Sequence, residues 1–168
     1  IDQAIAYANM IDARANHIMA GFANGQNAHA TFIENLRYAL SQTRRTILIE
    51  PLNRHDAPGY FLASTHQAHT IIKELGSSQV KLMFDCYHVG RTEGDLRTRM
   101  EVLLPVIGHI QFASVPDRGT PDHGEIDYTW IFQEIDKLGW ANPLGAEYKP
   151  SVATDDSLNW LARTTVER

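Results

Sequence analysis

The sequence has little of what marks several large classes of protein. Its one cysteine, Cys86, leaves no partner for an internal disulfide, so a reducing, cytoplasmic setting is expected. No apolar run approaches the roughly 20 residues of a membrane-spanning helix, and no secretory signal pattern opens the chain. Its 15 Lys and Arg are outnumbered by 20 Asp and Glu, for a net charge of −5. This balance argues against nucleic-acid binding, which usually needs a basic face.

What remains is the composition of an ordinary soluble globular protein. Apolar residues make up 43% of the chain and charged residues 21%. A length of 168 residues suits one domain with a hydrophobic core. No linker, low-complexity tract or shift in composition divides the chain, so residues 1–168 are interpreted as a single domain.

Short apolar runs alternate along the chain with segments of helical periodicity. Strands are predicted at residues 17–21, 46–50, 80–85, 107–112 and 144–148. Helices are predicted over residues 4–11, 28–41, 65–75, 95–104, 128–138 and 157–166. Strict alternation with apolar strands indicates an α/β fold, a parallel sheet covered by helices. His17 begins the first predicted strand and is therefore interpreted as structural.

Five strands leave two α/β architectures open. An open doubly wound sheet can be complete with five strands, whereas a (β/α)8 TIM barrel of about 250 residues has eight. The chain begins at Ile1 inside a helical pattern and without an initiator Met. Under the barrel interpretation, we therefore expect a partial barrel that lacks its N-terminal βα units and carries about strands 4–8.

Polar side chains end four successive strands of the predicted sheet: Glu50, Asp85, Gln111 and Glu147. A parallel sheet places all four carboxyl ends at one edge. In an open sheet these ends would be spread out at roughly 4.8 Å per strand, but in a barrel they converge on the mouth where active sites lie. The pattern therefore favours the barrel and predicts a site at its mouth.

Three carboxylates gathered in one place repel each other unless a cation lies between them. Two Glu, one Asp and the amide oxygen of Gln111 form an all-oxygen set, which favours Mg²⁺ or Mn²⁺ over Zn²⁺. Such a set leaves coordination positions open for substrate oxygens. The alternative is that these residues only cap helices or pair with Arg or Lys. Their recurrence at four strand ends favours the metal site.

Residues near these strand ends are candidates for substrate binding. His88 follows Asp85 by three residues and is expected to lie above the metal, in reach of a substrate hydroxyl. Arg118 lies in the loop after Gln111, where it could bind a substrate carboxylate with two hydrogen bonds. Lys149 shares the orientation of Glu147 by strand alternation. The weaker candidates are Asn53, Glu125 and His123.

The same segments resemble the hydroxypyruvate isomerase family of the xylose isomerase-like TIM barrel superfamily. The resemblance is carried by these five motifs: Glu50-Pro51-Leu52-Asn53, Phe84-Asp85-Cys86-Tyr87-His88, His109-Ile110-Gln111, Gly124-Glu125-Ile126-Asp127-Tyr128 and Glu147-Tyr148-Lys149-Pro150. It implies that Glu50 and Glu147 are both metal ligands and the acid/base pair, and that Asp85 and Gln111 complete the metal site. It also implies substrate contacts for His88 and Arg118. Ketose 3-epimerases usually carry His where Gln111 stands, which favours the hydroxypyruvate isomerase branch.

The function expected from this resemblance is interconversion of hydroxypyruvate and tartronate semialdehyde. The cation would stabilise an enediolate, while one Glu removes a carbon-bound proton and the other returns one. The alternatives are a ketose 3-epimerase or other sugar isomerase, an endonuclease acting at abasic sites, and a non-catalytic metabolite-binding barrel. The endonuclease would need a multi-zinc site rich in His and a basic face. The expected partner is a small keto acid or sugar, and a homo-oligomer is an open alternative.

Overall fold

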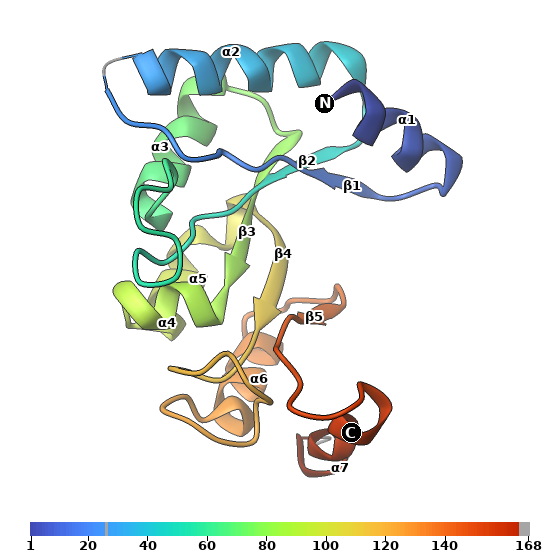
Figure 1. The fold of residues 1–168 in the computed structure, drawn as a ribbon, viewed down its shortest axis with the longest axis vertical. Coiled ribbons are helices and arrows are strands. Elements are labelled where there is room, and N and C mark those ends of the chain that lie inside the picture. The colour runs from blue at the N-terminus through green and yellow to red at the C-terminus, as the bar shows by residue number, and fades with distance from the viewer. Residues whose placement is uncertain (26, 165–168) are drawn as a thin grey trace.

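Five parallel strands, paired in the order β1-β2-β3-β4-β5, form the centre of the protein (Figure 1). The computed structural model describes residues 1–25 and 27–164. The strands are β1 (Ala15–His17), β2 (Thr46–Ile49), β3 (Val80–Asp85), β4 (Ile107–Phe112) and β5 (Leu144–Ala146). The helices are α1 (Asp2–Met10), α2 (Asn27–Gln42), α3 (Thr65–Leu75), α4 (Cys86–Thr92), α5 (Leu96–Leu103), η1 (Leu104–Val106), α6 (Tyr128–Lys137), η2 (Asp155–Trp160) and α7 (Leu161–Thr164).

The strand order decides between the two architectures that the sequence left open. A doubly wound sheet reverses its strand order at a switch point, whereas in a TIM barrel each strand lies beside the next one in the chain. Here all five strands are neighbours in sequence order. Figure 1 shows α2, α3, α5 and α6 following one another along one side of the strands, as the outer helices of a barrel do. The sheet is therefore a five-stranded section of barrel wall.

The helix ends follow the signals in the sequence. Ser64 caps α3 by accepting a hydrogen bond from the backbone N–H of Gln67, at 3.1 Å. Gly76 ends the same helix in the left-handed conformation, with φ of 61°, which glycine adopts without a steric cost. Asp127 caps α6 in the same manner as Ser64, by accepting from the backbone N–H of Trp130.

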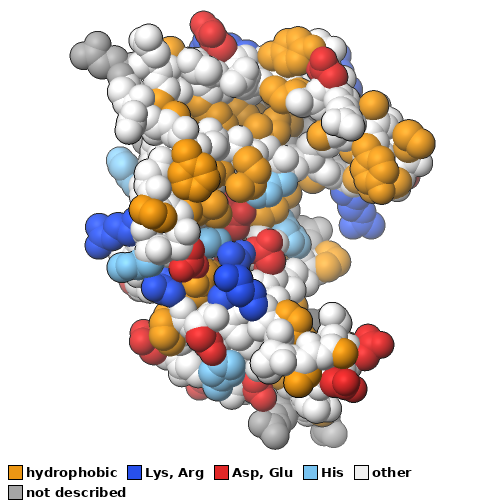
Figure 2. All heavy atoms as spheres, in the orientation of Figure 1, with side chains coloured by type: hydrophobic (Ala, Val, Ile, Leu, Met, Phe, Trp, Pro, Cys, Tyr) orange, Lys and Arg blue, Asp and Glu red, His pale blue; other side chains and the backbone are white. Residues whose placement is uncertain are grey.

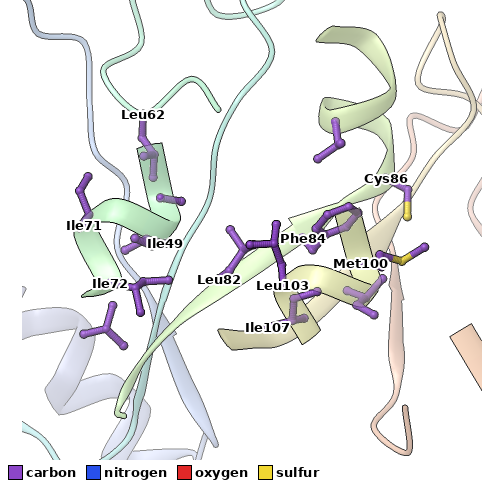
Figure 3. Packing of buried hydrophobic residues seen from close by; sticks show 14 of the residues in the cluster. Ile49, Leu62, Ile71, Ile72, Leu82, Phe84, Cys86, Met100, Leu103 and Ile107 are labelled. Atoms are coloured by element: carbon purple, nitrogen blue, oxygen red, sulfur yellow. The ribbon is translucent and has the colours of Figure 1, made fainter. Parts of the chain in front are cut away.

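The hydrophobic core lies between the helices and the outer face of the sheet (Figure 3). Ile49 of β2, Leu82 of β3 and Ile71 of α3 are each fully buried within it. Full burial of such a side chain is worth about 1.5–3 kcal/mol relative to its exposure. The strand ends that carry the polar residues are thus held on a rigid, well-packed base.

Two expectations from the sequence are wrong. The first strand spans Ala15–His17, with His17 as its last residue, because Ala15 pairs with Thr46 and His17 with Leu48. The predicted helices include none between residues 85 and 95, but the segment after Asp85 forms α4, capped by the Asp85 side chain. Its first four residues are all buried, so the segment lacks the polar face that reveals a helix in sequence.

Smaller differences concern the strand ends and the last helix. β2 ends at Ile49 and β5 at Ala146, which places Glu50 and Glu147 directly after their strands. The predicted closing helix is divided into η2 and α7, and its residues 165 and 166 lie outside the described residues. Within 1–25 and 27–164, no helix has the length and apolar character needed to cross a membrane.

Candidate metal and catalytic site

The predicted convergence of strand-end side chains is present. Asp85 and Gln111 are register partners on neighbouring strands β3 and β4. Glu50 and Glu147 follow β2 and β5 on either side of this pair. One possible ligand atom from each of Glu50, Asp85, Glu147 and His88 lies within 4.8 Å of the other three. Figure 2 shows acidic, basic and His side chains gathered at the middle of this face of the molecule.

Three side-chain oxygens in this group are buried without a hydrogen-bond donor. They are Oε1 of Glu50, Oδ2 of Asp85 and Oε1 of Gln111, none of which has a partner among the described residues. Glu50 is 4% exposed and Asp85 1%, so bulk water does not compensate for the missing donors. Buried, unpaired acceptors are costly, and a divalent cation would satisfy all three at once. The residues therefore fit the bound cation that their chemistry implies.

The electrostatics of the site agree with this fit. Burial, followed by the charges of Asp85 and Glu147, raises the pKa of Glu50 to about 8. Burial also raises the pKa of Asp85 to about 7, against the lowering effect of its hydrogen bond from the Tyr87 backbone. Arg118 lowers both pKa values, but less than burial raises them. Without a further positive charge, the site therefore retains protons near neutral pH.

Arg118 reaches the site from the loop after β4. Its guanidinium donates a hydrogen bond to Oε2 of Glu147 and lies 5.2 Å from the ring centroid of Tyr87. Its carbonyl accepts from the backbone N–H of Lys149 at 2.7 Å, which ties the loop to the segment after β5. The neighbouring Asp117 pairs with His123 instead of Arg118. The Arg118 side chain is thus held at the rim, with donors directed at the cluster.

His88 lies on α4 with its ring directed into the cluster. Its Nε2 is 3.6 Å from Oδ2 of Asp85 and 3.9 Å from Oε1 of Glu50. Burial and the nearby Arg118 lower the pKa of His88 to about 4, so the ring is neutral at physiological pH. Asn53 packs behind this ring, is fully buried, and contacts Nδ1.

His17 is a site residue that the sequence reasoning missed. Its Nε2 lies 3.6 Å from Oε2 of Glu50, and burial lowers its pKa. Only a strand placed at residues 15–17 makes His17 a fifth polar residue at a strand end. The apolar run at 18–20 displaced the prediction toward later residues.

Two predicted substrate-binding residues lie outside this cluster. Lys149 and Glu125 are both exposed. Neither side chain forms a hydrogen bond or ion pair with any residue that the structure describes, although the backbone N–H of Glu125 donates to the Val115 carbonyl. The cluster itself comprises Glu50, Asp85, Gln111, Glu147, His88, Arg118 and His17.

Comparison with known proteins places this chain in a family. The family model described as the xylose isomerase-like TIM barrel matches residues 1–164. The chain belongs to this family. Among curated members, it is 40% identical to the 2-oxo-tetronate isomerase of Cupriavidus necator over 96% of the chain and 65% of that protein. It is 41% identical to the hydroxypyruvate isomerase of Escherichia coli over 84% of the chain and 56% of that protein.

Solved structures share the fold. The crystal structure of a Brucella melitensis protein described as AP endonuclease, family 2, superposes with a TM-score of 0.92 at 36% identity, over 98% of this chain and 66% of that one. The 3-keto-D-glucoside 4-epimerase YcjR of E. coli superposes with a TM-score of 0.72 at 19% identity, over 89% of this chain and 63% of that one, which shows the fold alone. The chain spans 65% and 56% of the two curated relatives, which are longer proteins.

Proposed function

We propose that this protein is a metal-dependent isomerase that moves a proton between adjacent carbons of a small 2-oxo acid, with hydroxypyruvate and tartronate semialdehyde as the favoured pair. The observation that carries the proposal is the convergence of Glu50, Asp85, Gln111 and Glu147 from four strands, with buried oxygens that lack donors. The names of the two curated relatives support the same reaction class. The five strands are assigned in this proposal to about strands 4–8 of the barrel.

The cation is proposed to bind Glu50, Asp85, Gln111 and Glu147, and the oxygen-only donor set favours Mg²⁺ or Mn²⁺. When bound, such an ion supplies positive charge that polarises the substrate carbonyl and stabilises the enediolate.

The proton transfers are assigned to the two glutamates. One carboxylate accepts the proton from the hydroxymethyl carbon, which leaves an enediolate, and the other donates a proton to the former carbonyl carbon. Glu50 and Glu147 follow β2 and β5, so they approach from different sides of the site. The oxygen-bound proton moves through His88 or water.

Substrate orientation is assigned to Arg118 and His88 and, more weakly, to Lys149 and Glu125, whereas Asn53 contacts the ring of His88. Arg118 presents donors at the rim, where a planar guanidinium can bind a carboxylate with two hydrogen bonds. A carboxylate-bearing substrate fits this group better than a neutral ketose does, which favours a 2-oxo acid over the ketose substrates of the epimerase alternative.

The test is an isomerisation assay with the metal as a variable. The protein is treated with EDTA and incubated with hydroxypyruvate, 2-oxo-tetronate or a panel of ketoses in D₂O, and NMR follows product formation and carbon-bound deuterium. Turnover of the 2-oxo acids should be lost with EDTA and restored by Mg²⁺ or Mn²⁺. Preference for ketoses would favour the epimerase alternative. Binding without turnover, unaffected by EDTA, would favour the non-catalytic barrel.

The name of the Brucella structure makes an endonuclease the second candidate. That activity would require a site rich in His ligands and a basic face. The candidate site instead has three carboxylates, an amide and two His, His88 and His17, and the chain carries a net charge of −5. Incubation with duplex DNA containing an abasic site tests this alternative, and cleavage that requires Glu50 would replace the isomerase proposal.

A further inference from the structure

Two donors of Asn53 lie within hydrogen-bond distance of the same ring nitrogen of His88. The backbone N–H of Asn53 donates to Nδ1 at 3.0 Å, and the side-chain Nδ2 lies 2.8 Å from the same atom. A backbone N–H can only donate, so Nδ1 must be the acceptor and carries no proton in this arrangement. In a neutral imidazole, the ring proton then lies on Nε2.

The orientation of the Asn53 amide is fixed by independent contacts. Its Oδ1 accepts from the backbone N–H groups of His55 and Asp56, both at 3.0 Å. Its Nδ2 donates to Oδ2 of Asp56 at 3.1 Å, which leaves the second hydrogen of Nδ2 for Nδ1 of His88. Because Asn53 is fully buried and each of its side-chain atoms is in use, the amide cannot turn over without losing four contacts. It is also not free to bind a substrate directly.

Nε2 of His88 faces the opposite way, into the cluster. It is buried and has no hydrogen-bond partner among the residues described. The nearest acceptors are Oδ2 of Asp85 at 3.6 Å and Oε1 of Glu50 at 3.9 Å, both beyond normal hydrogen-bond length. A protonated ring nitrogen has no lone pair for a cation, but it can donate to an oxygen placed between these carboxylates.

We infer that Asn53 is a positioning residue that holds His88 in its Nε2–H tautomer, so that His88 donates to a substrate oxygen and does not ligate the cation. The identity of that oxygen as part of a 2-oxo acid rests on the proposed function. The tautomer itself rests only on the contacts within the chain. Although His88 is close enough to be counted among possible ligands, this assignment leaves Glu50, Asp85, Gln111 and Glu147 as the metal set.

NMR of the ¹⁵N-labelled protein tests the tautomer without reference to activity. Long-range ¹H–¹⁵N correlation spectra distinguish protonated from unprotonated ring nitrogens, and the signals of His88 are identified by their absence in His88→Gln. At neutral pH, Nδ1 should show the shift of an unprotonated nitrogen and Nε2 that of a protonated one, before and after Mg²⁺ is added. A protonated Nδ1, or loss of the Nε2 proton on addition of Mg²⁺, would overturn the inference.

Two variants test the part played by Asn53. Asn53→Ala removes one of the two donors, and should shift the tautomer ratio about fivefold to tenfold toward Nδ1–H, the value of one hydrogen bond. Asn53→Asp keeps an acceptor for the turn at His55 and Asp56 but places a carboxylate oxygen opposite Nδ1, and should protonate Nδ1 further. Asn35→Ala, on the exposed face of α2, is the matched control and should leave the spectrum unchanged.

The outcomes separate this inference from the proposed function. In Asn53→Ala, kcat for the 2-oxo acid should fall while the Mg²⁺ dissociation constant stays close to that of the wild-type protein. A gain in Mg²⁺ affinity as Nε2 loses its proton would identify His88 as a ligand and overturn the inference, as would a wild-type tautomer ratio in both Asn53 variants. If either variant does not fold, the wild-type spectrum still decides the tautomer. A wild-type protein with the Nε2–H tautomer but no isomerase activity would remove only the proposed function.

Discussion

One carboxylate oxygen of Glu50 and one of Asp85 lie within 4.8 Å of each other, and each residue has a buried oxygen with no donor in the part of the chain that is described. Burial favours the protonated forms of both residues, as does the charge of Glu147, with a pKa of about 8 for Glu50 and about 7 for Asp85. The two residues therefore hold either protons or a cation at neutral pH. Metal binding and pH must then be coupled.

The metal-free protein is expected to lose stability as the pH rises from 5 to 8. Both carboxyls have pKa values of about 4 in the unfolded chain and higher values when folded, so their protonated forms favour folding. That contribution is complete below pH 4 and is lost as the pH passes through 7 and 8. Thermal melts in EDTA should show a falling Tm over this range, and Glu50→Gln should flatten the fall.

The same coupling predicts that metal binds more tightly at higher pH. At pH 6 both carboxyls must release protons to bind Mg²⁺ or Mn²⁺, and at pH 8 few remain, so affinity should rise on the order of 10²-fold between the two. Isothermal titration calorimetry in buffers of different ionisation enthalpy measures both the affinity and the protons released. An affinity that does not change between pH 6 and pH 8 would contradict the assignment of these residues as ligands.

The core beneath the site is expected to tolerate little loss of volume. Ile71 of α3 is fully buried in the same cluster as Ile49 and Leu82 (Figure 3). Ile71→Ala should lower the free energy of unfolding by about 2–5 kcal/mol, through lost burial and the cavity that remains. Lys73→Ala, on the exposed side of the same helix, is the control and should change it by less than about 0.5 kcal/mol. Urea unfolding measures both, and equal effects would contradict the packing described.

How far the sequence predicts this structure depends on the kind of pattern that each element carries. The four strands ending near Glu50, Asp85, Gln111 and Glu147 are apolar and regularly spaced, so their existence, order and convergence could be predicted. The barrel fold could be predicted from this convergence, because four polar strand ends can meet only if the sheet curves into a barrel wall. The helix that starts after Ser64 could also be predicted, since its N-cap, its apolar stripe and its terminal glycine all indicate the same helix.

The misses have a common cause, which is tertiary burial. His17 belongs to a strand of only three residues whose register is set by pairing with β2, and nothing local in its sequence fixes that register. The first turn of α4 is buried on all sides, so no period of 3.6 appears in it. The role of Asn53 behind His88 depends on contacts across 35 residues, which spacing along the chain does not predict.

The acid/base assignment predicts that each glutamate is needed for turnover. Glu50→Gln and Glu147→Gln remove the exchangeable carboxyl but keep an oxygen ligand, so each should reduce kcat by about 10²–10⁴-fold, the usual worth of general acid–base catalysis. Glu34→Gln, exposed on α2, is the matched control and should leave kcat unchanged. Assays at saturating Mn²⁺, with metal binding measured separately, distinguish lost chemistry from lost metal. Near-normal kcat in either site variant would refute the two-base scheme.

Arg118 is predicted to select substrates that carry a carboxylate. Its guanidinium is held between Glu147 and the face of Tyr87, so its donors have a fixed direction at the rim. Arg118→Met should raise KM for a 2-oxo acid by about 10²-fold, within the range found when one member of a charged hydrogen-bonded pair is removed. KM for a neutral ketose should change far less.

Arg118→Lys separates charge from geometry at this position. Lysine keeps the positive charge but lacks the planar pair of donors, so it should restore only part of the lost affinity. Arg37→Met, on the exposed surface of α2, is the control for removal of one charge. If Arg118→Met raised KM equally for 2-oxo acids and ketoses, Arg118 would be acting mainly through Glu147. Full recovery in Arg118→Lys would show that charge alone, without the paired hydrogen bonds, orients the substrate.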